Sequence, residues 1–145
     1  MIGRNLILVR GISGSGKTTL AEVLAKKPLE CYLLEEGDDD WPVISADDYF
    51  IDADGNYNWS GEKLREAHAW CLSETESWMV CGEEKIFVAN TFAPERELTA
   101  YYDMAERYNY QVFSVVVENR HDGVSVHDVP EASLEKQRNR FKIKL

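Results

Sequence analysis

Apolar residues in this chain alternate between short continuous runs and longer segments in which they recur every three or four positions. Continuous runs are typical of buried parallel strands, whereas the wider spacing is typical of amphipathic helices. The runs predict strands at residues 6–9, 42–46, 86–89 and 111–117. The spaced segments predict helices at residues 18–26, 60–79, 93–108 and from residue 130 onward.

The order of these elements predicts an α/β fold. Strands that alternate with helices form a parallel sheet between two helical layers, here with about four to five strands. Because 145 residues is the length of one domain with one core, residues 1–145 are expected to form a single domain, with the irregular residues 119–129 as a short lid. Residues 29–41 show no clear pattern, and Cys31–Leu34 are compatible with either an extra strand or a helical turn.

The longest predicted helix carries a stripe of residues that we expect to face the core. Ser60 is the expected N-cap of this helix. On the stripe, His68 is expected to be a buried, hydrogen-bonded imidazole rather than a substrate contact. The stripe comprises Leu64, Ala67, His68, Cys71, Thr75, Trp78 and Met79.

Charge argues against a broad nucleic-acid-binding surface, because the formal net charge is -10 and the sequence pI is about 4.7. Residues 119–145 differ from the rest, since they hold six Lys and Arg against four Asp and Glu. Any contact with a polyanion would therefore be made by a local patch, and binding of ATP phosphates explains such a patch more economically.

Cysteine content and hydropathy indicate an intracellular protein. The three cysteines show no C-x-x-C spacing, so neither a disulfide framework nor a zinc site is implied, and reduced, buried thiols are expected. No apolar run approaches the roughly 20 residues that span a bilayer, so we expect no membrane contact. A cytoplasmic location is expected, and this expectation also covers a phage-encoded protein in a bacterial host.

The strongest motif is Gly11–Thr18, the phosphate loop, which matches the Walker A pattern G-x-x-x-x-G-K-[ST] at every fixed position. It follows a predicted strand and opens a predicted helix, as this motif requires. Its backbone N–H groups would surround the phosphates of ATP, Lys17 would reach the β- and γ-phosphates, and Thr18 would bind Mg²⁺. The residues expected to contact the nucleotide here are Gly11, Ser13, Gly14, Ser15, Gly16, Lys17, Thr18 and Thr19.

Two carboxylates, Asp47 and Asp48, follow the second predicted strand. Ligands of open parallel sheets bind beyond the carboxyl ends of the strands, so these side chains are expected to face the same opening as the phosphate loop. Asp47 is a candidate general base and metal ligand, although an aspartate pair that only caps the next turn remains an alternative. Arg120 is a candidate lid cation that closes over the transferred phosphoryl group, with Arg138 and Arg140 as second candidates.

The chain resembles the polynucleotide 5′-hydroxyl kinase-like branch of P-loop phosphotransferases, which includes small phage and bacterial AAA-type ATP-binding kinases. The similarity spans nearly the whole chain in order. The D-D-Y and N-T elements narrow it beyond the phosphate loop. The matching segments are Gly11–Thr18, Ile44–Phe50, Glu66–His68, Asn90–Thr91, Val126–Pro130 and Arg138–Phe141.

This resemblance implies a three-layer P-loop kinase fold, ATP and Mg²⁺ as cofactors, and a role for several side chains. Asp47 matches the general base toward the acceptor hydroxyl, and Arg120 matches a lid arginine that stabilises the transferring group. Thr91 matches a residue near the phosphoryl path, and Arg138 is expected to contact the nucleotide. Acceptor binding is expected at Asp48, Tyr49, Asn90 and Thr91. The chain departs from the phage kinases at Phe50, where they have an arginine, and at Asn90, where they have a carboxylate.

Three functions remain open from the sequence. The leading one is an ATP-dependent kinase that phosphorylates a hydroxyl group of a single-stranded nucleic acid end or a nucleotide, with Tyr49, Phe50, Tyr57 and Trp59 available to stack on a base. The second is a small-molecule kinase of the antibiotic or sugar type, whose neutral or cationic acceptors suit an acidic surface. The third is a nucleotide-dependent binding module with slow ATPase activity.

Overall fold

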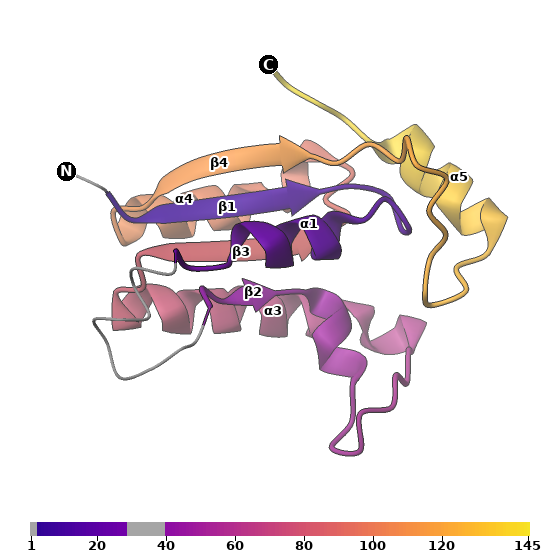
Figure 1. Cartoon of the computed structure of the whole chain (residues 1–145), viewed down its shortest axis with the longest axis horizontal. Coiled ribbons are helices and arrows are strands. Elements are labelled where there is room, and N and C mark those ends of the chain that lie inside the picture. The colour runs from indigo at the N-terminus through magenta and orange to yellow at the C-terminus, as the bar shows by residue number, and fades with distance from the viewer. Residues whose placement is uncertain (1–2, 29–39) are drawn as a thin grey trace.

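A computed structural model describes residues 3–28 and 40–145 of the chain. Its centre is a parallel sheet with the order β2-β3-β1-β4, formed by β1 (Asn5–Arg10), β2 (Val43–Ile44), β3 (Lys85–Asn90) and β4 (Gln111–Val116). The lid, the last helix and the segment after β2 all lie beyond the carboxyl ends of these strands (Figure 1). The predicted α/β fold with a parallel sheet is confirmed.

Helices lie on both faces of the sheet because its two central strands, β1 and β3, are apolar and buried on both faces. In β1, Leu6 and Leu8 face a core formed with α3 (Leu64–Cys81) and α4 (Thr99–Arg107). Val9 points to the opposite face, where it packs with Ala21 of α1 (Lys17–Leu24). This alternation follows from the two-residue repeat of a strand. The remaining helix, α5 (Glu131–Arg140), follows the lid.

Two predicted helices begin later than the sequence indicated. Ser60 precedes a short 3-10 turn, η2 (Gly61–Lys63), and makes no side-chain capping hydrogen bond, so it is not the N-cap of α3. The helix predicted at residues 93–108 is a 3-10 turn, η3 (Glu95–Glu97), followed by α4. A third 3-10 turn, η1 (Ala46–Phe50), carries the D-D-Y residues directly after β2.

The stripe of α3 is narrower than predicted. Its buried residues are Ala67, Cys71, Thr75 and Met79, one residue per turn. Leu64 and Trp78 are exposed, and His68 is exposed too, so the expectation of a buried imidazole was wrong. A helix that contacts the sheet along one line buries only the i, i+4 row, and its flanking positions remain in contact with solvent.

The cysteines differ in their environments. Cys71 is buried, and burial raises the pKa of its thiol, as expected for an unreactive core cysteine. Cys81 is exposed, which corrects the expectation that it is buried. Cys31, together with the segment 31–34, lies outside the described residues. Among the residues that are described, no helix combines the length and the apolar character needed to cross a membrane.

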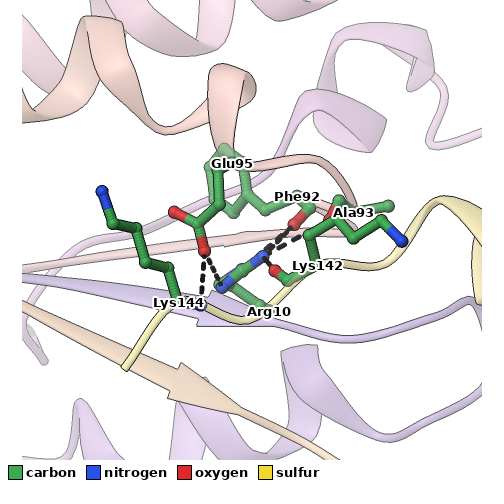
Figure 2. A network of polar contacts seen from close by, with 6 residues as sticks. All are labelled: Arg10, Phe92, Ala93, Glu95, Lys142 and Lys144. Carbon is green, nitrogen blue, oxygen red and sulfur yellow. Dashed lines mark hydrogen bonds and ion pairs between the residues drawn. The ribbon is translucent and has the colours of Figure 1, made fainter.

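Arg10 joins three segments beside the phosphate loop (Figure 2). Its side chain is buried at the end of β1 and donates hydrogen bonds to the backbone oxygen of Phe92, at 3.0 Å from Nε and 2.8 Å from Nη2. It also donates to the backbone oxygen of Lys142 at 2.5 Å, and pairs with the Glu95 carboxylate at 3.4 Å. Glu95 in turn accepts a hydrogen bond from the backbone N–H of Lys144. Arg10 therefore ties the segment after α5 to the loop after β3.

Candidate active site

The phosphate loop connects β1 to α1, and its glycines are required by geometry. Gly14 and Gly16 have φ angles of 85° and 87°, which L side chains rarely adopt. A Cβ atom on Gly14 would lie 2.8 Å from the backbone nitrogen of Ser125 in the lid. Glycine at these positions thus allows both the left-handed turns of the loop and the close approach of the lid.

A pocket of about 260 Å³ lies at this loop. It is bordered by three segments that are far apart in the sequence, namely the phosphate loop with the start of α1, the turn η1, and the lid at residues 119–129. Its lining residues are Ser13, Gly14, Gly16, Lys17, Thr18, Thr19, Asp47, His121, Gly123, Val124, Ser125, Val126 and His127.

Polar groups in the loop are left for a ligand. Burial lowers the pKa of Lys17, although the charge of Asp47 opposes this effect. Within the described residues the Lys17 ammonium group makes no hydrogen bond or ion pair. The hydroxyl of Ser15 is fully buried and also has no hydrogen-bond partner there. Buried polar groups of this kind are costly unless a partner is supplied. A phosphate chain is an appropriate partner for a buried ammonium group in a glycine-rich loop at a helix N-terminus.

Thr18 and Asp47 are the residues in this pocket that could hold Mg²⁺. The part of the chain that the structure describes contains no cluster of three or more His, Cys, Asp or Glu side chains suited to a metal. Magnesium in nucleotide sites normally takes only one or two protein oxygens and completes its shell with phosphate oxygens and water. A hydroxyl and a carboxylate that line the same pocket fit that requirement.

The two adjacent carboxylates have different roles. Asp48 Oδ2 accepts a hydrogen bond from the backbone N–H of Ser45 at 3.1 Å and closes a capping box at the start of η1. Burial and, more weakly, the charge of Asp47 raise the pKa of Asp48. Asp47 instead lines the pocket, and its Oδ1 accepts a hydrogen bond from the hydroxyl of Tyr57 at 3.1 Å. The capping alternative therefore describes Asp48 and not Asp47.

Asn90 lies behind the pocket rather than in it. The side chain is buried, and its Oδ1 accepts a hydrogen bond from the backbone N–H of Ala46 at 2.8 Å. Its Nδ2 lies 3.5 Å from the sulfur of Cys71. Asn90, predicted to bind the acceptor, thus joins the end of β3 to the first residue of η1, and so supports the turn that carries Asp47. Thr91 is half-buried, does not line the pocket, and accepts a hydrogen bond at its backbone oxygen from Gly11 N–H at 3.3 Å.

The four aromatic residues proposed for base stacking are not equivalent. Phe50 is buried in the main core and is not available to a base, which corrects that expectation. The hydroxyl of Tyr49 donates a hydrogen bond to Glu66 at 2.9 Å, away from the residues that line the pocket. Trp59 is exposed, and Tyr57 is half-buried beside Asp47.

The three candidate arginines lie outside the pocket lining. Arg120 donates a hydrogen bond to Glu118 at 2.5 Å, and both side chains are exposed. On the exposed side of α5, Arg138 pairs with Glu131, and Arg140 pairs with Glu97 of η3 at 3.6 Å.

Contact between α5 and the phosphate loop is made by a different residue. Gln137 accepts a hydrogen bond from the backbone N–H of Ser13 at 2.8 Å and donates one to the Ser13 hydroxyl at 3.0 Å. Gln137 could not be recognised from the sequence, because its position in the predicted helix carries no motif.

Two lid histidines, His121 and His127, line the pocket and were not identified from the sequence. A Cβ atom on Gly123 would lie 2.6 Å from Nε2 of His121, and one on Gly16 would lie 3.4 Å from its Cε1, so this imidazole sits against the phosphate loop. Asn119 braces the same turn through hydrogen bonds to the backbone oxygen and nitrogen of Gly123. The available signal was that two of the three histidines fall within the eleven residues predicted as the lid.

Comparisons with known proteins give a consistent result. A family model described as an AAA domain matches residues 6–143. NEDD4-binding protein 2 of Homo sapiens is 29% identical over 111 residues, which cover 77% of this chain. The chain spans only 6% of that much longer protein.

Two solved structures extend the similarity to the fold. Kti12 of Chaetomium thermophilum, in complex with ADP-AlF3, has a TM-score of 0.63 and 17% identity, over 95% of this chain and 80% of that one. A chain of the Pnkp1/Rnl/Hen1 RNA repair complex has a TM-score of 0.55 and 17% identity, over 99% of this chain and 41% of that one. At these identities the structural likeness establishes the fold.

Proposed function

The chain belongs to the AAA domain family with a P-loop kinase fold, and on that basis we propose that it is an ATP-dependent phosphotransferase that moves the γ-phosphate to a hydroxyl acceptor. The acceptor we propose is the 5′-hydroxyl of a polynucleotide or a nucleotide. One observation carries the proposal: Lys17, Thr18 and Asp47 line a single pocket, which residues of the lid also border.

In this proposal each part of the pocket has one task. The backbone N–H groups of the phosphate loop and the ammonium group of Lys17 bind and neutralise the phosphates of ATP. Thr18 and Asp47 would hold Mg²⁺, which would supply positive charge to the phosphate oxygens. Asp47 accepts the proton of the acceptor hydroxyl as that oxygen bonds to the γ-phosphorus and the bond to ADP breaks.

The lid excludes water from this pocket. Gly123 to His127 border it directly, and a Cβ atom on Gly123 would lie 2.7 Å from the backbone oxygen of Gly14, so lid and loop are in close contact. Exclusion of water favours transfer to the acceptor over hydrolysis of ATP. Because Arg120 is exposed and paired with Glu118, its role over the phosphoryl group remains a prediction that requires a change of its side-chain position.

Support for a nucleic-acid or nucleotide acceptor comes from three sources. The sequence resembles polynucleotide kinases, one structural neighbour belongs to an RNA repair complex, and the aromatic ring of Trp59 is exposed. Base stacking on such rings is tolerant of sequence and needs no extended basic surface. This matters because the chain as a whole is acidic.

The test is transfer of label from γ-labelled ATP by the wild type and by Asp47→Asn. We expect Asp47→Asn to lose transfer, because the amide cannot accept the proton. Asp48→Asn is the matched control, since Asp48 is the neighbouring carboxylate and caps η1 outside the pocket lining. Lys17→Ala should abolish all labelling. Retained transfer in Asp47→Asn would refute the assignment of the base.

The acceptor is identified by a panel of single-stranded and duplex oligonucleotides with 5′-hydroxyl ends, free nucleosides and small alcohols. Label on oligonucleotides or nucleosides supports the proposal. Label on a small alcohol alone would favour a small-molecule kinase instead. ATP hydrolysis that is unaffected by any acceptor and by Asp47→Asn would indicate a binding module with slow ATPase activity.

A further inference from the structure

Tyr57 lies between the proposed base and the lid, and contacts both. Its hydroxyl donates a hydrogen bond to Asp47 Oδ1 at 3.1 Å. Its ring stacks on the imidazole of His127, with ring centroids 3.8 Å apart and an interplanar angle of 18°. Asp47 and His127 both line the pocket, so Tyr57 connects two of its walls.

The loop that carries Tyr57 is held in place by its own hydrogen bonds. Tyr57 forms a β-bridge with Ile51, and the backbone N–H of Asn58 donates to the backbone oxygen of Phe50 at 2.8 Å. The carboxylate of Asp52 accepts hydrogen bonds at 2.9 Å each from Asp54 N–H, Asn56 N–H and Asn58 Nδ2. These bonds lower the pKa of Asp52, so the carboxylate stays ionised and keeps the loop closed.

We propose that Tyr57 is a positioning residue for Asp47, and that its stack with His127 couples closure of the lid to alignment of the base. This inference rests on the proposed function of Asp47. The phenol donates to one lone pair of Oδ1, so Oδ2 would accept the proton of the acceptor hydroxyl and the second lone pair of Oδ1 would remain for Mg²⁺. Stacking on His127 restrains the phenol ring only when the lid is closed, so the base is aligned when water is excluded.

The chemistry of the phenol suits this role. An ordinary phenol is neutral at neutral pH, and here its O–H donates to Asp47 Oδ1. A neutral donor orients a carboxylate without taking its proton.

Substitutions separate the hydrogen bond from the stack. Tyr57→Phe removes the hydroxyl and keeps the ring, and His127→Ala removes the stack and keeps the hydroxyl. With a single-stranded 5′-hydroxyl oligonucleotide as acceptor, Tyr57→Phe should lower kcat about tenfold, the effect of losing one hydrogen bond to a charged group, with the KM for ATP unchanged.

Loss of the stack should act on the lid instead. His127→Ala should raise the ratio of ATP hydrolysis to transfer, and His127→Phe should restore the wild-type ratio, because a flat ring is retained. Tyr57→Phe should also cost less in the His127→Ala background than in the wild type, since an unstacked phenol no longer aligns Asp47.

Hydrogen exchange gives a readout that needs no acceptor. Tyr57→Ala should increase amide exchange across residues 119–129, and Tyr57→Phe should not, provided that thermal unfolding shows both variants folded. Unchanged kcat in Tyr57→Phe, or unchanged amide exchange of the lid in Tyr57→Ala, would overturn the inference about Tyr57. In that case, loss of transfer in Asp47→Asn would still support the proposed function. Retained transfer in Asp47→Asn would overturn the proposed function itself.

Discussion

Substitution of Arg10 by alanine should destabilise the protein strongly, although Arg10 contacts no residue in the pocket lining. The guanidinium group is 2% exposed and donates to the backbone oxygens of Phe92 and Lys142. Alanine would leave both oxygens without this donor, and a buried acceptor left unsatisfied costs about 1–3 kcal/mol. We therefore expect a loss of about 2–5 kcal/mol in the free energy of unfolding, a large share of the roughly 5–15 kcal/mol of a typical domain.

Glu95→Gln provides the comparison at the other end of the network. The Glu95 side chain is 33% exposed and its ion pair with Arg10 is 3.4 Å long, so solvent screens the charge. Glutamine keeps an oxygen that can accept from Lys144 N–H, and the expected loss is below about 1 kcal/mol. Arg10→Met separates hydrogen bonding from packing, because methionine fills much of the volume and donates nothing.

Urea denaturation followed by tryptophan fluorescence and circular dichroism measures these three variants. If the hydrogen bonds dominate, Arg10→Met should remain nearly as destabilised as Arg10→Ala. Recovery of wild-type stability in Arg10→Met would show that the cost arises from a cavity, and a loss of less than about 1 kcal/mol in Arg10→Ala would refute the reasoning altogether.

Two further predictions follow from groups whose pKa is shifted. Burial lowers the pKa of Lys17, so the charged side chain destabilises the ligand-free protein at neutral pH. The Tm of Lys17→Met should therefore match or exceed that of the wild type. This variant should also lose the rise in Tm that ADP causes, which corresponds to about 2.7 kcal/mol of stabilisation at 100 times Kd. A rise that persists would count against the phosphate site. Burial raises the pKa of Asp48, so its contribution to stability is present at acidic pH and is lost as pH rises through the folded-state value. Asp48→Asn should therefore gain Tm relative to the wild type as pH increases from about 4 to 7, and parallel curves would contradict this.

Local patterns in the sequence determined the order of strands and helices, the phosphate loop, and the position of Asp47. Each of these depends on a short-range rule. Continuous apolar runs mark buried parallel strands, glycines at fixed offsets permit the left-handed turns of the loop, and parallel strands bring their carboxyl ends to one edge. Asp47 follows β2 and the phosphate loop follows β1, so the shared pocket was predictable without coordinates.

Only the tertiary structure decided which side chains enter that pocket. In the lid, His121 and His127 line the pocket while Arg120 pairs with Glu118. An irregular segment has no periodicity from which these side-chain directions could be inferred. Asn90 is the last residue of β3, a position typical of site residues, yet its side chain is buried and accepts a hydrogen bond from Ala46 N–H instead of facing the pocket. The stabilising role of Arg10 was likewise not predictable, because its hydrogen-bond acceptors lie 82 to 132 positions away in the sequence. Such pairings arise only when the chain is folded, and no local pattern records them.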